Sequence, residues 1–315
     1  MFTKIEAIKH EVAKVVVGQE KMIDGLLIGL LCEGHVLIEG IPGLAKTTTV
    51  KALSESLGLC FKRVQFTPDL LPSDILGAEI YDPQNNAFKI KQGPIFTNLL
   101  LADEINRAPA KVQSALLEVM QERQVTIGDE SFKLDPPFFV MATQNPVEQE
   151  GVYQLPEAQL DRFMLKLQVG YNTKEEELEI ARRIANKLSS TISAVVSMED
   201  IDALKVAINA IHIDEEVERY IIDLVSATRE PKAYGLDDVA EYIQFGASPR
   251  VSIDMFKAVK AMAFLRAKDF VTPVDVAYII KDLMRHRLIL TYEAEAEGIT
   301  TDEIIDKVLE VVPVP

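Results

Sequence analysis

Apolar runs and helical periodicity divide the chain into two parts. Over residues 1–171, short apolar runs alternate with segments of helical pattern. Runs of this length, bounded by turn residues and separated by helices, are typical of buried strands in a parallel sheet. The first part is therefore predicted to be an α/β layer with five strands, at His35–Glu39, Phe61–Gln65, Leu99–Asp103, Phe138–Thr143 and Phe163–Val169.

The pattern changes at residues 171–173. Thr173 is followed by a lysine and three glutamates, which is typical of a helix N-cap with acids in the first turn. From there on, helical periodicity dominates and strand signals vanish. We therefore expect a domain boundary near residue 172, with an α/β core over residues 1–171 and a smaller all-α domain over residues 172–315.

Two insertions interrupt the α/β part. Residues 79–91 contain two short alternating runs about the turn residues 83–86, and residues 124–134 alternate in the same way about Gly128-Asp129. Alternation about such turn residues is typical of a β-hairpin. The sequence therefore predicts two hairpins, at about 79–91 and 124–134.

A phosphate-binding loop is predicted over residues 40–47, directly after the first strand. Backbone N–H groups of such a loop cradle phosphates, and the N-terminus of the following helix adds a partial positive charge. Lys46 would reach the β- and γ-phosphates, and the hydroxyl of Thr47 would coordinate Mg²⁺. The usual pattern has glycine where this chain has Ala45, which is acceptable if φ is negative there. The expected nucleotide contacts are Gly40, Pro42, Gly43, Leu44, Ala45, Lys46, Thr47 and Thr48.

An acidic pair follows the third apolar run. Asp103 and Glu104 stand where a buried strand ends, so both side chains can face one site. Asp103 would hold Mg²⁺, and Glu104 would act as the general base that polarises the attacking water. An acidic pair is also common at a solvated strand end, but its place after a phosphate loop favours the catalytic interpretation.

Other polar positions each have two interpretations. Asn145, after the fourth strand, is either a water-orienting group or part of an Asn-Pro turn. Arg162 is either an arginine finger or a structural arginine at a helix C-terminus. Arg250 stands in a predicted first helical turn, where a cation is unfavourable unless it serves an anion such as phosphate. Gly18 and Gln19 either contact the adenine base or form a plain turn.

Composition restricts the classes of protein that remain. With 48% hydrophobic residues the chain can bury a sizeable core, and no long uncharged apolar run predicts a membrane span. The net charge of −16 argues against non-specific nucleic-acid binding, which needs clustered cations. The N-terminus lacks a signal-peptide pattern, and Cys32 and Cys60 are expected as core thiols rather than a disulfide. These features predict a cytoplasmic protein.

Taken together, five motifs resemble the MoxR family of AAA+ ATPases, and the resemblance covers nearly the whole chain. The motifs are Gly40–Thr47, Leu101–Ala108, Ala142–Pro146, Leu155–Phe163 and Gly246–Arg250. The alanine in the phosphate loop is usual in that family. The resemblance implies an ATP- and Mg²⁺-dependent P-loop ATPase core with a helical lid, working as a ring that is commonly a hexamer.

The resemblance also assigns roles to residues. It implies Walker A at 40–47, Walker B at Asp103 and Glu104, sensor 1 at Asn145, the arginine finger at Arg162 and sensor 2 at Arg250. The predicted hairpins match two insertions of that branch. The role of Arg107, next to the acidic pair, stays open between this subunit and a neighbouring one.

Two classes of function remain. Family members are chaperone-like remodellers that assist assembly, maturation or metal insertion of client proteins, with a von Willebrand factor A domain protein as partner in trans. The alternative is a DNA- or RNA-translocating motor of the helicase type, or a magnesium-chelatase-type motor, because related motors share the hairpin insertions. The neutral to acidic hairpin tips, residues 82–86 and 128–130, favour protein remodelling over nucleic acid.

Overall fold

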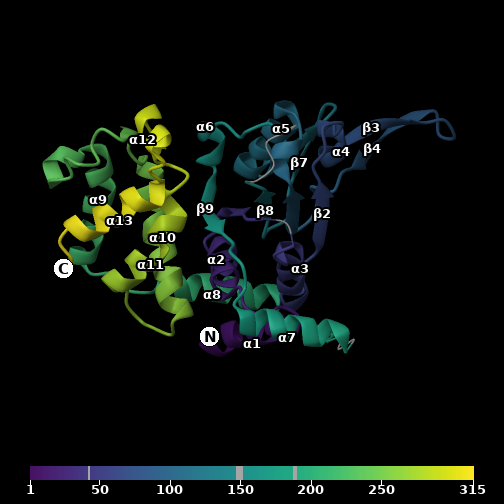
Figure 1. Cartoon of the computed structure of the whole chain (residues 1–315). Helices are drawn as coiled ribbons and strands as arrows, with labels where there is room; N and C mark the ends of the chain where they lie inside the picture. Colours follow the sequence, from purple (N-terminus) through teal and green to yellow (C-terminus); the bar gives the residue numbers. More distant parts are fainter. Residues whose placement is uncertain (42, 147–151, 187–189) are drawn as a thin grey trace. The chain divides into compact units, whose positions relative to one another are not determined.

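The computed structural model describes residues 1–41, 43–146, 152–186 and 190–315 (Figure 1). These residues form two compact units. The sheet unit comprises Thr3–Phe163 and Leu167–Met198. The helical unit comprises Glu199–Pro315 together with Met1–Phe2 and Met164–Lys166. In the described parts of the chain, no helix is long and apolar enough to cross a membrane.

A five-stranded sheet forms the centre of the sheet unit, as predicted. Its order is β2-β5-β8-β1-β9, so the first strand of the sequence lies between the fourth and the fifth. The pairs β2–β5, β5–β8 and β8–β1 are parallel, and Met141 of β8 lies opposite Leu101 of β5 on one side and Val36 of β1 on the other. The strands are β1 (His35–Glu39), β2 (Phe61–Gln65), β5 (Leu99–Asp103), β8 (Phe139–Gln144) and β9 (Phe163–Gln168).

Each apolar run of the sequence is the length of one strand of this sheet. β9 (Phe163–Gln168) forms one edge of the sheet beside β1, and β2 forms the other edge. The three central strands β5, β8 and β1 are almost wholly buried, whereas β2 is half-exposed. Cys60, which precedes the edge strand β2, is therefore exposed and Cys32 is half-buried, so neither is the core thiol that we expected. The two cysteines do not form a disulfide, as expected.

Helices cover both faces of the sheet. On one face α5 (Ala110–Glu122) buries Leu116 and Leu117 in a core shared with Leu100 and Val140. On the other face α2 (Glu20–Leu31) approaches so closely that a Cβ at Gly29 would lie 2.5 Å from Val36. The remaining helices of this unit are α1 (Phe2–Ala13), α3 (Lys46–Ser56), α4 (Pro72–Leu76), α6 (Glu157–Leu160) and α7 (Lys174–Ala185).

Both predicted hairpins are present. The first pairs β3 (Gly77–Asp82) with β4 (Ala87–Gln92), and the second pairs β6 (Gln124–Ile127) with β7 (Glu130–Lys133). In Figure 1 the β3–β4 hairpin extends away from the sheet. Tyr81 and Phe88 stand opposite each other on it, largely exposed, with ring centroids 5.4 Å apart.

The helical unit contains α8 (Met198–Asn209), α9 (Glu215–Arg229), α10 (Pro249–Leu265), α11 (Pro273–Met284), α12 (Tyr292–Glu297) and α13 (Thr301–Val311). It is not purely helical, because β10 (Ile243–Phe245) pairs with β11 (Ile289–Leu290). These strands are too short to produce an alternating pattern, which is why the sequence did not predict them.

The helix α7 begins at the predicted N-cap. Thr173 accepts a hydrogen bond from the backbone of Glu176, whose carboxylate accepts one from the backbone N–H of Thr173. By packing, however, α7 belongs to the sheet unit, and the division falls at Met198. The change of pattern near residue 172 thus marks where the strands of the five-stranded sheet end, and packing separates the two units later in the chain.

A buried histidine makes the stability of the sheet unit depend on pH. His35 Nε2 donates to the carbonyl of Met120 (3.0 Å), and Nδ1 accepts from the N–H of Val140 (3.1 Å), so the ring is neutral. Burial lowers the pKa of His35 to about 4. Because the folded pKa lies below the unfolded one of about 6.5, the unfolded chain binds more protons between these values.

We therefore expect the free energy of unfolding to fall as the pH drops from about 6.5 to about 4, by about 3 kcal/mol from this residue. Above pH 6.5 its contribution should be constant. Urea unfolding at pH 7 and at pH 4.5 measures the loss. Other groups also titrate in acid, so the comparison is with His35→Gln, which should lose less stability over this interval. Equal losses in the two proteins would contradict the prediction.

Candidate functional site

The predicted phosphate loop joins the end of β1 to the start of α3. A Cβ at Gly40 would lie 2.8 Å from the carbonyl oxygen of Val169, so glycine is required by the close approach of the chain after β9. The helix α3 begins at Lys46, as the pattern predicted. The first backbone N–H groups of α3 are therefore directed to the loop, as an anion site at a helix N-terminus requires.

The backbone at Ala45 corrects one expectation. Its φ is +55°, in the left-handed region, and not negative as we required for an alanine in place of glycine. The loop must reverse direction immediately before α3, and this reversal places the residue before Lys46 in that region. A side chain with a Cβ is strained there by about 1–2 kcal/mol.

Ala45→Gly is accordingly expected to raise the free energy of unfolding by about 1 kcal/mol, since the relief of strain exceeds the added entropy of the unfolded glycine. Denaturant unfolding at neutral pH checks this. Ala52→Gly, within α3, is the matched control and should destabilise the protein by about 1 kcal/mol. A loss of stability in both variants would show that the loop conformation is not strained.

Lys46 lies half-buried over the loop. Its Nζ donates to the carbonyl oxygen of Gly40 at 2.5 Å. Burial lowers the pKa of Lys46, and the negative charges of Asp103, Glu104 and Glu39 oppose that shift. The ammonium group is thus held near three carboxylates in a partly desolvated place, where its attraction to a phosphate is strong.

A cavity of about 340 Å³ lies over the loop and brings most of the predicted residues together. It is lined by Gly43, Leu44, Ala45, Lys46, Thr47, Thr48, Asp103, Glu104, Thr143 and Asn145. Pro42 lies outside the described residues. The loop, the acidic pair and Asn145 come from three different strand ends, so they meet because the carboxyl ends of parallel strands lie at one edge of the sheet.

Asp103 is held by two neighbours. It is 8% exposed, and its Oδ1 accepts a hydrogen bond from the hydroxyl of Thr143 at 2.5 Å. Its Oδ2 accepts from Nε (2.9 Å) and Nη2 (2.7 Å) of Arg63, on β2. Thr143 thus positions one oxygen of the Asp103 carboxylate, and the cation Arg63 positions the other.

Glu104 is held in place by its backbone and by two side chains. Its φ of +56° lies in the left-handed region, and its N–H donates to the hydroxyl of Thr143 (2.8 Å). Its Oε2 accepts from Nε2 of Gln65 at 2.6 Å and lies 3.1 Å from Nε of Arg107. Arg107, whose role the sequence left open, thus forms an ion pair within its own chain.

Sequence reasoning missed three residues of this network, namely Arg63, Gln65 and Thr143. Arg63 Nη2 also donates to Oε1 of Gln65 (2.8 Å), so the two residues position both acids together. A signal was available, because Gln65 ends the second predicted strand and Thr143 the fourth, at the edge where ligands bind. Which acid each one contacts depends on strand order, and that is not visible in a single sequence.

Carboxylate and hydroxyl oxygens near Lys46 fit a Mg²⁺-nucleotide. Mg²⁺ in nucleotide sites is held by one or two protein oxygens, with phosphates and water completing its shell. Asp103 and Thr47 both line the cavity and supply such oxygens. The donor set is therefore chemically suitable for the predicted metal.

Four other predicted residues of the sheet unit, Gly18, Gln19, Gly40 and Arg162, do not line this cavity. Nε2 of Gln19 donates to Asn172 Oδ1 (2.6 Å) and to the carbonyl of Gly170 (3.2 Å), and Gly18 lies against the carboxylate of Glu176. These contacts hold the segment before α2 against the segment that leads into α7. A contact with adenine stays a prediction.

The two predicted arginines belong to different units. Nη1 of Arg162 donates to the carbonyl of Leu117 (3.0 Å) and to Oε1 of Gln121 (2.6 Å), both on α5. Arg250 is in the first turn of α10, in the helical unit, after an extended Ser248. Their roles as finger and sensor stay predictions.

Comparison with known proteins gives the class and then the family. The model of the ATPase family associated with various cellular activities (AAA) matches residues 35–165, and that of the AAA lid domain matches residues 237–308. Chaperone MoxR1 of Mycobacterium tuberculosis is 47% identical over 99% of this chain and 82% of its own length. Protein MoxR of Methylorubrum extorquens is 31% identical over 98% of this chain and 94% of its own.

A solved structure agrees with the family models and with the two relatives. The crystal structure of a Cytophaga hutchinsonii protein described as an ATPase matches with a TM-score of 0.94 and 53% identity, over 100% of this chain and 96% of that one. The chain therefore belongs to the MoxR family of AAA ATPases. It is a chaperone-like ATPase with a P-loop α/β core and a helical lid.

Proposed function

We propose that this chain hydrolyses ATP in the cavity over residues 43–48 and uses the energy to remodel client proteins. The observation that carries the proposal is the meeting of the loop, Asp103, Glu104 and Asn145 around one cavity. Lys46 and the loop N–H groups bind the phosphates. Asp103 and Thr47 hold Mg²⁺, which supplies charge neutralisation at the phosphates when bound. Glu104 accepts a proton from the attacking water, and Asn145 orients that water.

The finer function is protein remodelling by a ring. We propose a cytoplasmic homo-oligomer, a hexamer by family resemblance, that assists assembly, maturation or metal insertion of client complexes. A von Willebrand factor A domain protein acts with it in trans. Similarity to proteins named MoxR and Chaperone MoxR1 supports this choice.

The alternative motor acting on nucleic acid is less well supported. The exposed tip of the β3–β4 hairpin carries an aspartate and two asparagines rather than a cluster of cations, and Lys89 beside it is paired with Asp82 at 3.3 Å. Backbone phosphates require several unpaired cations on one surface. A magnesium-chelatase-type motor is a further alternative, and a magnesium-chelatase subunit of Nicotiana tabacum is 27% identical over 76% of this chain.

The arginine finger is tested by the concentration dependence of hydrolysis. If Arg162 reaches the γ-phosphate of a neighbouring subunit, ATPase activity per subunit should rise with protein concentration and then level off as rings assemble. Arg162→Ala should lower the plateau by about 10³-fold or more, and it should poison mixed rings. The measurement is specific ATPase activity over a dilution series.

A matched control separates the finger from its own packing. Gln121→Ala removes the partner that Arg162 contacts in its own chain and should leave the plateau near the original value. Constant activity per subunit down to a verified monomer would contradict the shared site. Arg162 would then hold only its structural place against α5.

A further inference from the structure

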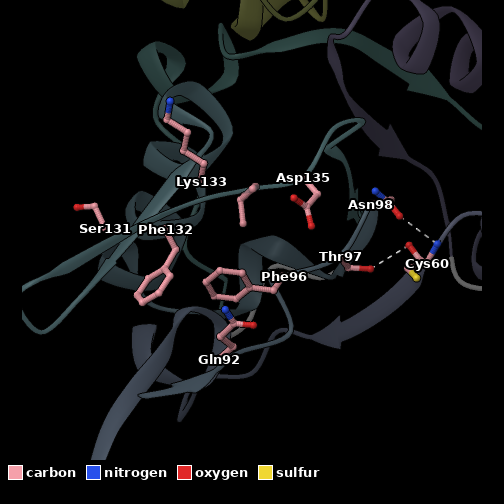
Figure 2. A pocket seen from close by; sticks show the side chains of 10 residues that line it. Cys60, Gln92, Phe96, Thr97, Asn98, Ser131, Phe132, Lys133 and Asp135 are labelled. Atoms are coloured by element: carbon pink, nitrogen blue, oxygen red, sulfur yellow. Dashed lines mark hydrogen bonds between the residues drawn. The ribbon is translucent and has the colours of Figure 1, made fainter. Parts of the chain in front are cut away.

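A second cavity, of about 500 Å³, lies far along the strands from the nucleotide cavity. Cys60 precedes β2 and Asn98 precedes β5, so this cavity is at the amino ends of strands whose carboxyl ends carry the acidic pair. The other lining residues are Gln92 at the end of β4, Phe96 and Thr97 before β5, and residues 131–135 in and directly after β7 (Figure 2). No role assigned above uses them.

One wall of the cavity is an open strand edge. In the described part of the chain β7 pairs only with β6. The two-residue turn 128–129 makes Ile127 and Glu130 the closing hydrogen-bonded pair. Alternation along an antiparallel pair then directs the backbone N–H and C=O groups of Ser131 and Lys133 away from β6. The side chains of Thr126 and Ser131, 2.9 Å apart, agree with a non-hydrogen-bonded pair at that position.

The rest of the cavity combines an apolar floor with polar side chains. The rings of Phe96 and Phe132 meet edge to face with centroids 6.1 Å apart. Thr97 and Asn98 are fixed, because they hydrogen-bond the backbone of Cys60 (2.9 and 3.3 Å; dashed lines in Figure 2). Among the described residues, the side chains of Gln92 and Asp135 make no hydrogen bond or ion pair, so they are available to a ligand.

We propose that this cavity binds an extended segment of a client polypeptide, which adds as a strand to the open edge of β7. Outward backbone groups at every second residue match an extended chain, and a neighbouring apolar hollow accepts one of its alternate side chains. This inference rests on the proposed function, since it assumes that the client is a protein.

Local charge points to the composition of the segment. Lys133 lies on the open edge, and Asp135 is the one acid among the lining residues, so the charges of the lining balance. The segment therefore carries an aliphatic residue for the aromatic hollow and uncharged neighbours.

Backbone pairing is tested with a labelled peptide. The probe is a fluorescein-labelled eight-residue peptide of alternating valine and threonine, and binding is read by anisotropy. Lys133→Pro removes one outward N–H at an edge position where proline fits, whereas Lys133→Ala keeps it. We expect Lys133→Pro to weaken binding about fivefold or more relative to Lys133→Ala, as for the loss of one hydrogen bond.

A second measurement changes the probe and leaves the protein intact. Peptides N-methylated at alternate amides lose their donors on one edge only. One of the two N-methylated series should bind about fivefold or more weakly and the other close to the original. Equal binding of both series, or of Lys133→Pro and Lys133→Ala, would overturn the proposal. Peptide binding that appears only when rings are diluted to monomers would assign the edge to a second copy of this chain.

The outcomes separate this inference from the proposed function. Peptide binding is measured in Glu104→Gln and so does not depend on hydrolysis. If ATP-driven remodelling of clients is absent but binding follows the expected pattern, the remodelling function fails and the strand-addition site remains. If clients are remodelled but neither Lys133→Pro nor N-methylation of the peptide changes binding, the strand-addition site is wrong and the remodelling function remains.

Discussion

Glu104→Gln is expected to slow ATP hydrolysis by about 10²–10⁴-fold while ATP still binds. Glutamine has the shape of glutamate and can stay within reach of Gln65 and Arg107, which lie 2.6 and 3.1 Å from Oε2. It cannot accept the proton of the attacking water. Steady-state turnover and equilibrium binding of a fluorescent ATP analogue measure the two effects separately.

Removal of a negative charge by itself should not have this effect. Glu118→Gln, on the exposed side of α5, is the control and should turn over at the original rate. If Glu104→Gln hydrolyses ATP as fast as the original protein, the base is another group. If it no longer binds ATP, the glutamate shapes the site and the base role is not supported.

Lys46→Ala is expected to weaken ATP binding by about 10- to 100-fold, and with it hydrolysis at limiting ATP. A charge-assisted hydrogen bond to phosphate contributes about 1.5–3 kcal/mol, and alanine supplies none. Titration with a fluorescent ATP analogue gives the change in affinity. The free protein should not lose stability, because burial already lowers the pKa of this ammonium group.

Lys51→Ala is the matched control in the same helix. Lys51 is exposed and pairs with Glu55 at 3.7 Å, so its removal takes one positive charge from α3 without reaching the cavity. Its affinity for ATP should stay near the original. Equal affinity in Lys46→Ala and the original protein would mean that phosphates bind elsewhere.

Much of the site was predictable because its residues are close in sequence to strand ends. The loop 40–47 follows one apolar run, the acidic pair ends another, and Asn145 follows a third. A parallel sheet brings such ends to one edge whatever the strand order. The cavity over the loop confirms that these three segments meet.

Contacts between strands were not predictable in the same way. Arg63 reaches Asp103, and Gln65 reaches Glu104, only because β2 lies beside β5 in register, with Gln65 opposite Asp103. Arg162 fits a finger by its place in the sequence, yet its guanidinium contacts α5 in its own chain. Side-chain contacts of this kind depend on partners that are distant in sequence.

The sequence by itself determined the five strands, the two hairpins, the start of α3 and the cluster of predicted nucleotide-site residues, because these follow from local periodicity and turn chemistry. The tertiary structure alone decided the left-handed backbone at Ala45, the ion pair of Arg63 with Asp103, the division of the units at Met198 and the open edge of β7. These depend on which segments become neighbours, and packing between distant residues decides that.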